Sequence, residues 1–153
     1  MSQFSNNIYT IHNNIFSLTP ILVSFYKNLI AKDKDILLSY FVFPTVLSPI
    51  ATEEFKRIPV KSNLTRLVAN KKFMFGFQSR FEQYKQITNN CLQYAIDCNY
   101  LKIRENLSIE ALNQDVLYTD NSLASAINLA SQLPNVFKLD VINTYYAFGI
   151  KGL

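Results

Sequence analysis

The segment from Phe75 to Asn99 constrains the fold more than any other part of this sequence. Its apolar residues recur at intervals of three or four and are followed directly by Ala95: Phe77, Phe81, Tyr84, Ile87, Cys91 and Tyr94. In an α-helix this spacing brings the side chains onto one face. The pattern therefore predicts one long helix with a single apolar face, preceded by a loop at Gly76.

A shorter helix is predicted near the start of the chain. Its N-terminus falls at Asn13 or Asn14, or later at Thr19, where Thr as N-cap and Pro20 at the first helical position form a start signal. Both starts stay open. The helix is predicted from apolar residues at helical spacing: Ile21, Phe25, Leu29 and Ile30.

The most apolar stretch of the chain runs from Ile36 to Ala51, and Asp33 or Asp35 is a possible cap at its start. Pro44 argues against a central strand, so we favour a helix that is kinked or ended at Phe43–Pro44. The stretch is short for a bilayer span of about 20 residues, and serine and proline interrupt it. It predicts a buried core segment and no membrane anchor.

The part of the chain after the long helix predicts a hairpin and two helices. Leu101 and Ile103 alternate, as do Val116 and Tyr118 less cleanly, so two short strands are expected there. Asp120 then caps an amphipathic helix that Pro134 stops. A last helix covers 139–148 and ends at Gly149, and another short one covers 64–68 after Ser62 as cap.

Together these elements predict a mainly α fold with a small β wing (α+β). The length of 153 residues suits a single domain. Within it, we expect residues 1–70 to form a helical part that leads into a winged-helix-like part, residues 71–153.

The composition combines ordinary apolar content with few charges, because 49% of the residues are hydrophobic and 17% are charged. A surface poor in charge is typical of one that another chain covers. Codon bias in a low-GC genome yields a similar composition, and both interpretations stay open. If another chain does cover part of the surface, the candidate partner interface is the aromatic C-terminal segment: Tyr145, Tyr146, Phe148 and Ile150.

The sequence shows no set of catalytic residues, and it predicts no cofactor and no metal ligands. The single His12 lacks a Cys or His at zinc-ligand spacing, and the three glycines form no phosphate-binding loop. On a helix Cys91 and Cys98 are about 10.5 Å apart, too far for a disulfide. Reduced cysteines and the lack of a secretory signal predict a cytoplasmic location.

Positive charge is concentrated between residues 56 and 85. This segment holds eight basic residues and one acidic residue, a net charge of +7 against +4 for the whole chain. Such a segment predicts a face for DNA phosphates or an acidic partner, or else a solvated surface. The candidate residues are Lys56, Arg57, Lys61, Arg66, Lys71, Lys72, Arg80 and Lys85.

Three phenylalanines alternate within the basic segment, at Phe73, Phe75 and Phe77. Exposed rings among cations stack bases in single-strand binding proteins. Alternate aromatic residues more often anchor a core, which is the favoured interpretation here.

The order of the motifs resembles the middle component of bacterial ABC three-component systems, including the small subunit of Lamassu-type antiphage defence. An Asn-led apolar helix and a segment closing on proline come first, followed by a charged stretch, the long helix, an Ala-rich helix and a glycine near the end. The corresponding stretches are NNIFSLTPILVSFYKNLI, ILLSYFVFPTVL, EEFKRIP, SRFEQYKQITNNCLQYAIDCNYL, ASAINLASQLPNVF and YYAFGIKGL. The chain departs from the family at Ser131 and Gln132, where members often have Gly and Trp.

The resemblance implies a role without catalysis. In such systems an SMC-like ABC ATPase hydrolyses nucleotide and engages DNA, and an effector subunit, often a nuclease, acts on the target. The middle component is thought to bridge the two. We therefore expect a non-catalytic bridging subunit with these partners and contact to DNA through the complex without sequence specificity. The alternative from another class is an independent winged-helix DNA-binding regulator.

Overall fold

Helices dominate the part of the chain that the computed structural model describes, which is residues 14–57, 63–115 and 121–152. The first half contains α2 (Ile15–Asn28), the 3₁₀ helix η1 (Asp35–Phe41), α3 (Val42–Val46), α4 (Pro49–Arg57), α5 (Leu64–Val68) and α6 (Lys71–Met74). The second half contains α7 (Phe77–Asp97), β1 (Leu101–Ile103), β2 (Ile109–Ala111), η2 (Asn121–Leu123), α8 (Ala124–Gln132), η3 (Leu133–Asn135) and α9 (Val141–Ala147). This confirms the mainly α class with a small β part, while the winged-helix arrangement stays a prediction.

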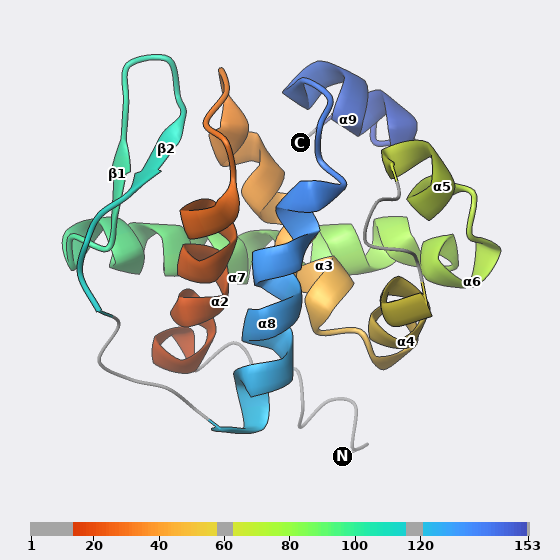
Figure 1. The fold of residues 1–153 in the computed structure, drawn as a ribbon, viewed down its shortest axis with the longest axis horizontal. Helices are drawn as coiled ribbons and strands as arrows, with labels where there is room; N and C mark the ends of the chain where they lie inside the picture. Colours follow the sequence, from red (N-terminus) through yellow and green to blue (C-terminus); the bar gives the residue numbers. More distant parts are fainter. Residues whose placement is uncertain (1–13, 58–62, 116–120, 153) are drawn as a thin grey trace.

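The long helix α7 runs along the longest axis of the molecule, and α2 and α8 cross in front of it (Figure 1). The predicted apolar face is confirmed, because five of its seven members are buried and Tyr84 and Tyr94 are half-buried. Asn99 ends the helix with a φ of +58°. The Tyr100 amide donates to the Ala95 carbonyl at 2.8 Å and the Asn99 amide donates to the Ile96 carbonyl, the pairing of a Schellman motif.

Helix α2 packs against both α7 and α8. Of its two predicted starts, Asn14 is confirmed: its Oδ1 accepts a hydrogen bond from the Ser17 amide at 3.3 Å. The start at Thr19–Pro20 is wrong, because Pro20 lies inside the helix. The Thr19 hydroxyl donates to the Ile15 carbonyl at 2.7 Å, so the threonine is bonded within the helix instead of capping it.

The apolar stretch after α2 is helical, as predicted, but its break lies elsewhere. Pro44 is the third residue of α3, a position at which the missing N–H has no intrahelical partner in any case. The chain breaks after Val46 and restarts at Pro49, the first residue of α4. The predicted Asp cap is also wrong: η1 follows Lys34 at φ +61°, and Asp35 lies inside η1.

The side chain of Asp35 connects two parts of the fold instead of capping a helix. Its Oδ2 accepts a hydrogen bond from the Lys32 amide at 2.9 Å, and its Oδ1 accepts one from the Ile109 amide at 2.8 Å. The residue is fully buried. Burial raises the pKa of this carboxyl, although both backbone N–H donors act in the opposite direction.

The predicted hairpin forms, but with a different second strand. β1 and β2 are antiparallel, with Leu101 opposite Ala111 and Ile103 opposite Ile109. The strand expected at Val116 and Tyr118 lies outside the described residues, as does the expected cap Asp120. The second strand, Ile109–Ala111, therefore lies between the two stretches that were expected to be strands.

The tip of the hairpin lies against the start of η1 and the connector that precedes it. The Lys34 amide donates to the Asn106 carbonyl at 2.9 Å, and the Ile36 amide donates to the Leu107 carbonyl at 3.1 Å. A two-stranded hairpin is marginally stable alone, so these bonds and the Asp35 side chain hold it in place.

The last two helices follow the prediction closely. α8 begins at Ala124, and Pro134 lies in η3, directly after its end. α9 begins after Asp140, whose Oδ1 accepts a hydrogen bond from the Asn143 amide at 2.8 Å. The expected cap Ser62 is outside the described residues, and Asn63 caps α5 instead.

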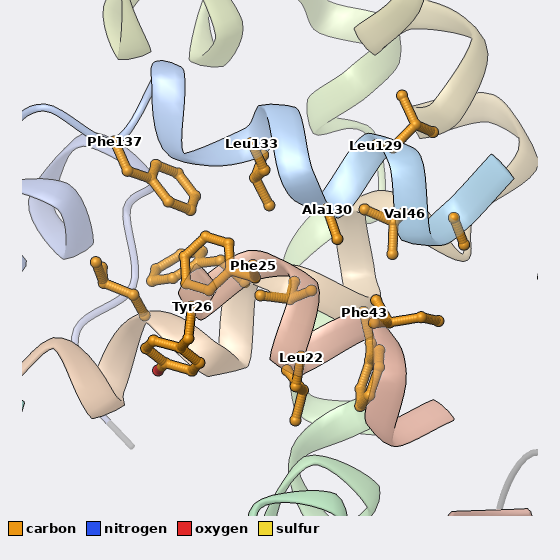
Figure 2. Close-up of a cluster of buried hydrophobic side chains, with 14 of the residues drawn as sticks. Leu22, Phe25, Tyr26, Phe43, Val46, Leu129, Ala130, Leu133 and Phe137 are labelled. Atoms are coloured by element: carbon orange, nitrogen blue, oxygen red, sulfur yellow. The ribbon is translucent and has the colours of Figure 1, made fainter. Parts of the chain in front are cut away.

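Large side chains from both halves of the chain form one hydrophobic core, which extends from Leu18 to Ile150. Figure 2 shows Ala130 of α8 and Leu133 of η3 pointing toward α2, which supplies Leu22 and Phe25. Phenylalanine dominates the largest fully buried side chains: Phe25, Phe41, Phe43, Phe73, Phe77, Phe81 and Phe137. In the described ranges, no helix has both the length and the apolar character that crossing a bilayer requires.

Candidate functional site

Two of the four predicted interface residues lie in the core. Phe148 is 5% exposed, and its ring centroid is 4.5 Å from that of Phe41 in η1 and 4.9 Å from that of Phe77 in α7. Ile150 is also buried. Their side chains hold the C-terminal segment onto this molecule's own core and offer little surface to another chain.

The backbone after α9 turns these two side chains inward. Gly149 has φ +70°, in the left-handed region that favours glycine. Its amide donates to the Tyr146 carbonyl at 3.0 Å, and the Ile150 amide donates to the Tyr145 carbonyl at 3.1 Å. This is the second Schellman motif of the fold, and it accounts for the predicted helix end at Gly149.

Tyr145 and Tyr146 are adjacent but lie in opposite surroundings. The Tyr145 hydroxyl donates to the Leu37 carbonyl at 2.7 Å, and burial raises the pKa of this half-buried phenol well above its usual range. The Tyr146 ring is 76% exposed. Tyr146 is therefore the predicted interface residue whose side chain faces outward.

The outer side of α9 carries an apolar face that the sequence interpretation missed in part. Leu139, two residues before α9 begins, and Ile142 and Tyr146 within it follow one another at intervals of three and four residues and are all exposed, Ile142 at 60%. We call these three residues the α9 outer face. Their spacing was the available signal, but the same helix has a second apolar set at Val141 and Phe148, which is buried. Two apolar faces on one short helix obscure the pattern.

A groove of about 680 Å³ adjoins the α9 outer face. Apolar side chains of Leu37, Val141, Ile142 and Ile150 line most of it. Lys151 is the one charged residue in its described lining. Together, the groove and the α9 outer face form an apolar surface next to a cation.

The predicted basic residues do not form one uniform face. Three of them are held in ion pairs: Lys56 with Glu53 at 4.0 Å, Arg57 with Glu54 at 3.5 Å, and Lys85 with Glu82 at 2.9 Å. Lys61 lies outside the described residues. Within the described ranges, Arg66, Lys71 and Lys72 are exposed and form no ion pair.

Arg80 has a structural role instead of a surface one. Its guanidinium donates to three backbone carbonyls: Phe75 at 2.6 Å, Phe73 at 2.9 Å and Pro44 at 3.3 Å. Partial burial lowers the pKa of this guanidinium. Because Nε, Nη1 and Nη2 each donate to a carbonyl, Arg80 is not free to bind a phosphate in a bidentate manner.

Other reactive groups are few in the described part of the chain. It contains no group of three or more His, Cys, Asp or Glu side chains placed to hold a metal ion. His12 lies outside the described residues. Burial raises the pKa of the Cys91 thiol to about 12, which makes it a poor nucleophile.

Comparison with known families identifies the chain. A sequence model of one family, the ABC-three component (ABC-3C) system Middle Component 3, matches residues 1–152. The chain belongs to this family. The match confirms the resemblance to a middle component and implies that this protein works with partner subunits. Neither a curated protein nor a solved structure matches the chain.

Membership in this family bears on both candidate surfaces. The family description names a component of a larger system. The surfaces that need an explanation are the α9 outer face with its groove and the cations of α5 and α6.

Proposed function

We propose that this middle component is a non-catalytic bridging subunit that joins an SMC-like ABC ATPase to an effector subunit. The complex would serve in bacterial antiphage or antiplasmid defence of the Lamassu type, in the cytoplasm. The observation that carries the proposal is the α9 outer face, an unpartnered apolar surface in a member of a multi-subunit family.

Apolar residues of α9 lie on both its buried and its exposed side. A surface helix normally turns polar residues to solvent, yet α9 exposes Ile142 and Tyr146 there together with Asn143. Residues at intervals of three and four match the seam that a second helix packs against. The groove beside them gives the same partner room for a large anchor side chain. We assign this surface to a helix of a partner subunit.

The experiment compares two isoleucines in equivalent positions. Ile142 and Ile50 are each the second residue of a helix and are 60% and 61% exposed. The chain would be co-expressed with its neighbouring genes, and the tagged middle component would be isolated with its partners. We expect Ile142→Asp to remove the partner subunits from the complex, because an unpaired carboxylate would enter an apolar interface.

The Ile50→Asp variant should keep a full complex, since the change lies on α4, away from the proposed surface. Both variants should melt like the wild type, because both side chains are exposed. Normal complex yield with Ile142→Asp would overturn the assignment of the α9 outer face. A chain that never co-purifies with an ATPase would overturn the bridging role.

The alternative function is that of an independent winged-helix DNA-binding regulator. A wing in such a protein must reach the DNA backbone, whereas the hairpin tip here is bonded to Lys34 and to Ile36 of η1. This argues for the subunit. Specific binding of the isolated chain to one promoter sequence at physiological salt would favour the regulator.

A further inference from the structure

The turn between α6 and α7 presents one aromatic ring to solvent. Phe73 and Phe77 are fully buried, and their stacked rings are 5.7 Å apart. Phe75 between them is 80% exposed. Two of the three alternating phenylalanines therefore belong to the core, and the third exposes its ring to solvent.

The ring of Phe75 is carried by a tightly bonded backbone. Arg80 binds the carbonyls of Phe73 and Phe75, and the Asn70 side chain caps α6 by accepting from the Phe73 amide at 2.9 Å. Gly76 reverses the chain at φ +67° to start α7. A ligand that contacts this turn does not have to order it first, which lowers the entropic cost of binding.

The surroundings of this ring are cationic. Residues 63–80 contain two lysines and two arginines and no carboxylate. Lys71 and Lys72 are exposed on α6 and precede Phe75, the C-cap residue of that helix, by four and three residues. The nearby α4 carboxylate of Glu54 is already engaged, at 3.0 Å by Asn70 and at 3.5 Å by Arg57. The positive charge beside Phe75 is therefore available to an anionic ligand.

We infer that the α6–α7 turn is a contact site for single-stranded nucleic acid, with a base stacked on Phe75 and phosphates against Lys71 and Lys72. A lone ring among cations offers a stacking face and charge neutralisation but lacks the contiguous apolar area of a protein-docking patch. The α9 outer face shows the contrast, since it is apolar and nearly uncharged. A membrane surface is a poorer fit, because α6 has four residues and interfacial helices are long.

Fluorescence anisotropy with a labelled oligothymidylate of about 15 nucleotides tests the inference at several salt concentrations. Phe75→Ala should weaken binding by about tenfold and leave the dependence on salt unchanged, since it removes stacking and no charge. The double change Lys71→Gln with Lys72→Gln should flatten the slope of log K against log salt by about 1.4. Duplex DNA should bind more weakly, because its bases are not free to stack.

Matched controls remove the same groups elsewhere. Tyr146→Ala removes an exposed ring from α9, and Lys27→Gln with Lys102→Gln removes two exposed charges from α2 and β1. Both controls should bind the oligonucleotide like the wild type. Equal affinity of Phe75→Ala and wild type would overturn the inference. The inference would also be overturned if the wild-type chain did not bind the oligonucleotide but bound anionic vesicles or an acidic peptide, and Phe75→Ala lost that binding.

This inference is independent of the proposed function, because the binding assay uses the chain without partners. Complex assembly depends on α9, whereas oligonucleotide binding depends on α6 and Phe75. The helices α6 and α9 lie apart on the molecule, with α5 between them (Figure 1). Failure of one experiment leaves the other unaffected.

Discussion

The substitution Phe148→Ala tests whether the C-terminal segment belongs to the core of this molecule. The Phe148 ring lies between Phe41 from the first half of the chain and Phe77 from the second, with a third ring, Phe137, at 6.1 Å. It therefore connects the two parts that the sequence interpretation distinguished, residues 1–70 and 71–153.

The magnitude follows from burial and from the surrounding rings. Truncation of a buried phenylalanine to alanine costs about 3–5 kcal/mol of unfolding free energy. Rigid rings on several sides limit how far the site can collapse around the void, so we expect a value in the upper half of that range. Tyr146→Ala is the control from the same helix, and its exposed ring should cost less than about 0.5 kcal/mol.

Guanidinium denaturation followed by far-UV circular dichroism gives both values. Because the chain has nine Tyr and no Trp, tyrosine emission is the natural second probe. We propose that the chain is a single domain, and the two probes should then report one coincident transition. The variant should shift the midpoint of that transition as a whole.

Two results would contradict this account. A loss below about 1 kcal/mol for Phe148→Ala would mean that the segment detaches easily from the core, as chain ends often do. Two separate transitions, with only the later residues affected, would refute the single domain.

Three further outcomes are expected. Asp35→Ala should lower the unfolding free energy by about 2–5 kcal/mol in denaturant titrations, since the amides of Lys32 and Ile109 lose their acceptor. Because burial raises the pKa of the Asp35 carboxyl above 3.8 in the folded state, its contribution to stability is greatest below that pH and declines as pH rises through the raised value. Asp35→Asn should lack this decline when both proteins are compared between about pH 3 and pH 7. Iodoacetamide at about pH 8 should modify half-buried Cys98 and spare Cys91 until the protein is denatured, as read by peptide mass spectrometry.

Most of the helices could be predicted because their local signals are strong. The stripe of α7 and the proline after α8 specify their elements without reference to distant residues. The second strand could not be placed in the same way. Ile109–Ala111 is three residues long, and its position depends on pairing with β1 and on the Asp35 side chain, which is 74 residues away in sequence.

The candidate surfaces were partly predictable for a similar reason. Composition marked the C-terminal aromatic residues, but it could not separate Phe148, which turns into the core after Gly149, from exposed Tyr146. Charge counting marked the segment of eight cations, but it could not show that Arg80 binds three carbonyls. Which side chains face solvent depends on tertiary contacts, and those were not visible in the spacing.

The bonded hairpin tip has a practical consequence for attaching a fluorophore or an affinity tag. Hairpin turns are usually the first choice for such insertions, because little depends on them. In this protein an insertion between Asn106 and Leu107 would separate two carbonyls that accept hydrogen bonds from the amides of Lys34 and Ile36. The solvent side of α7, at Gln86 or Gln93, is the safer attachment point, since both side chains are exposed and bond only within their own helix.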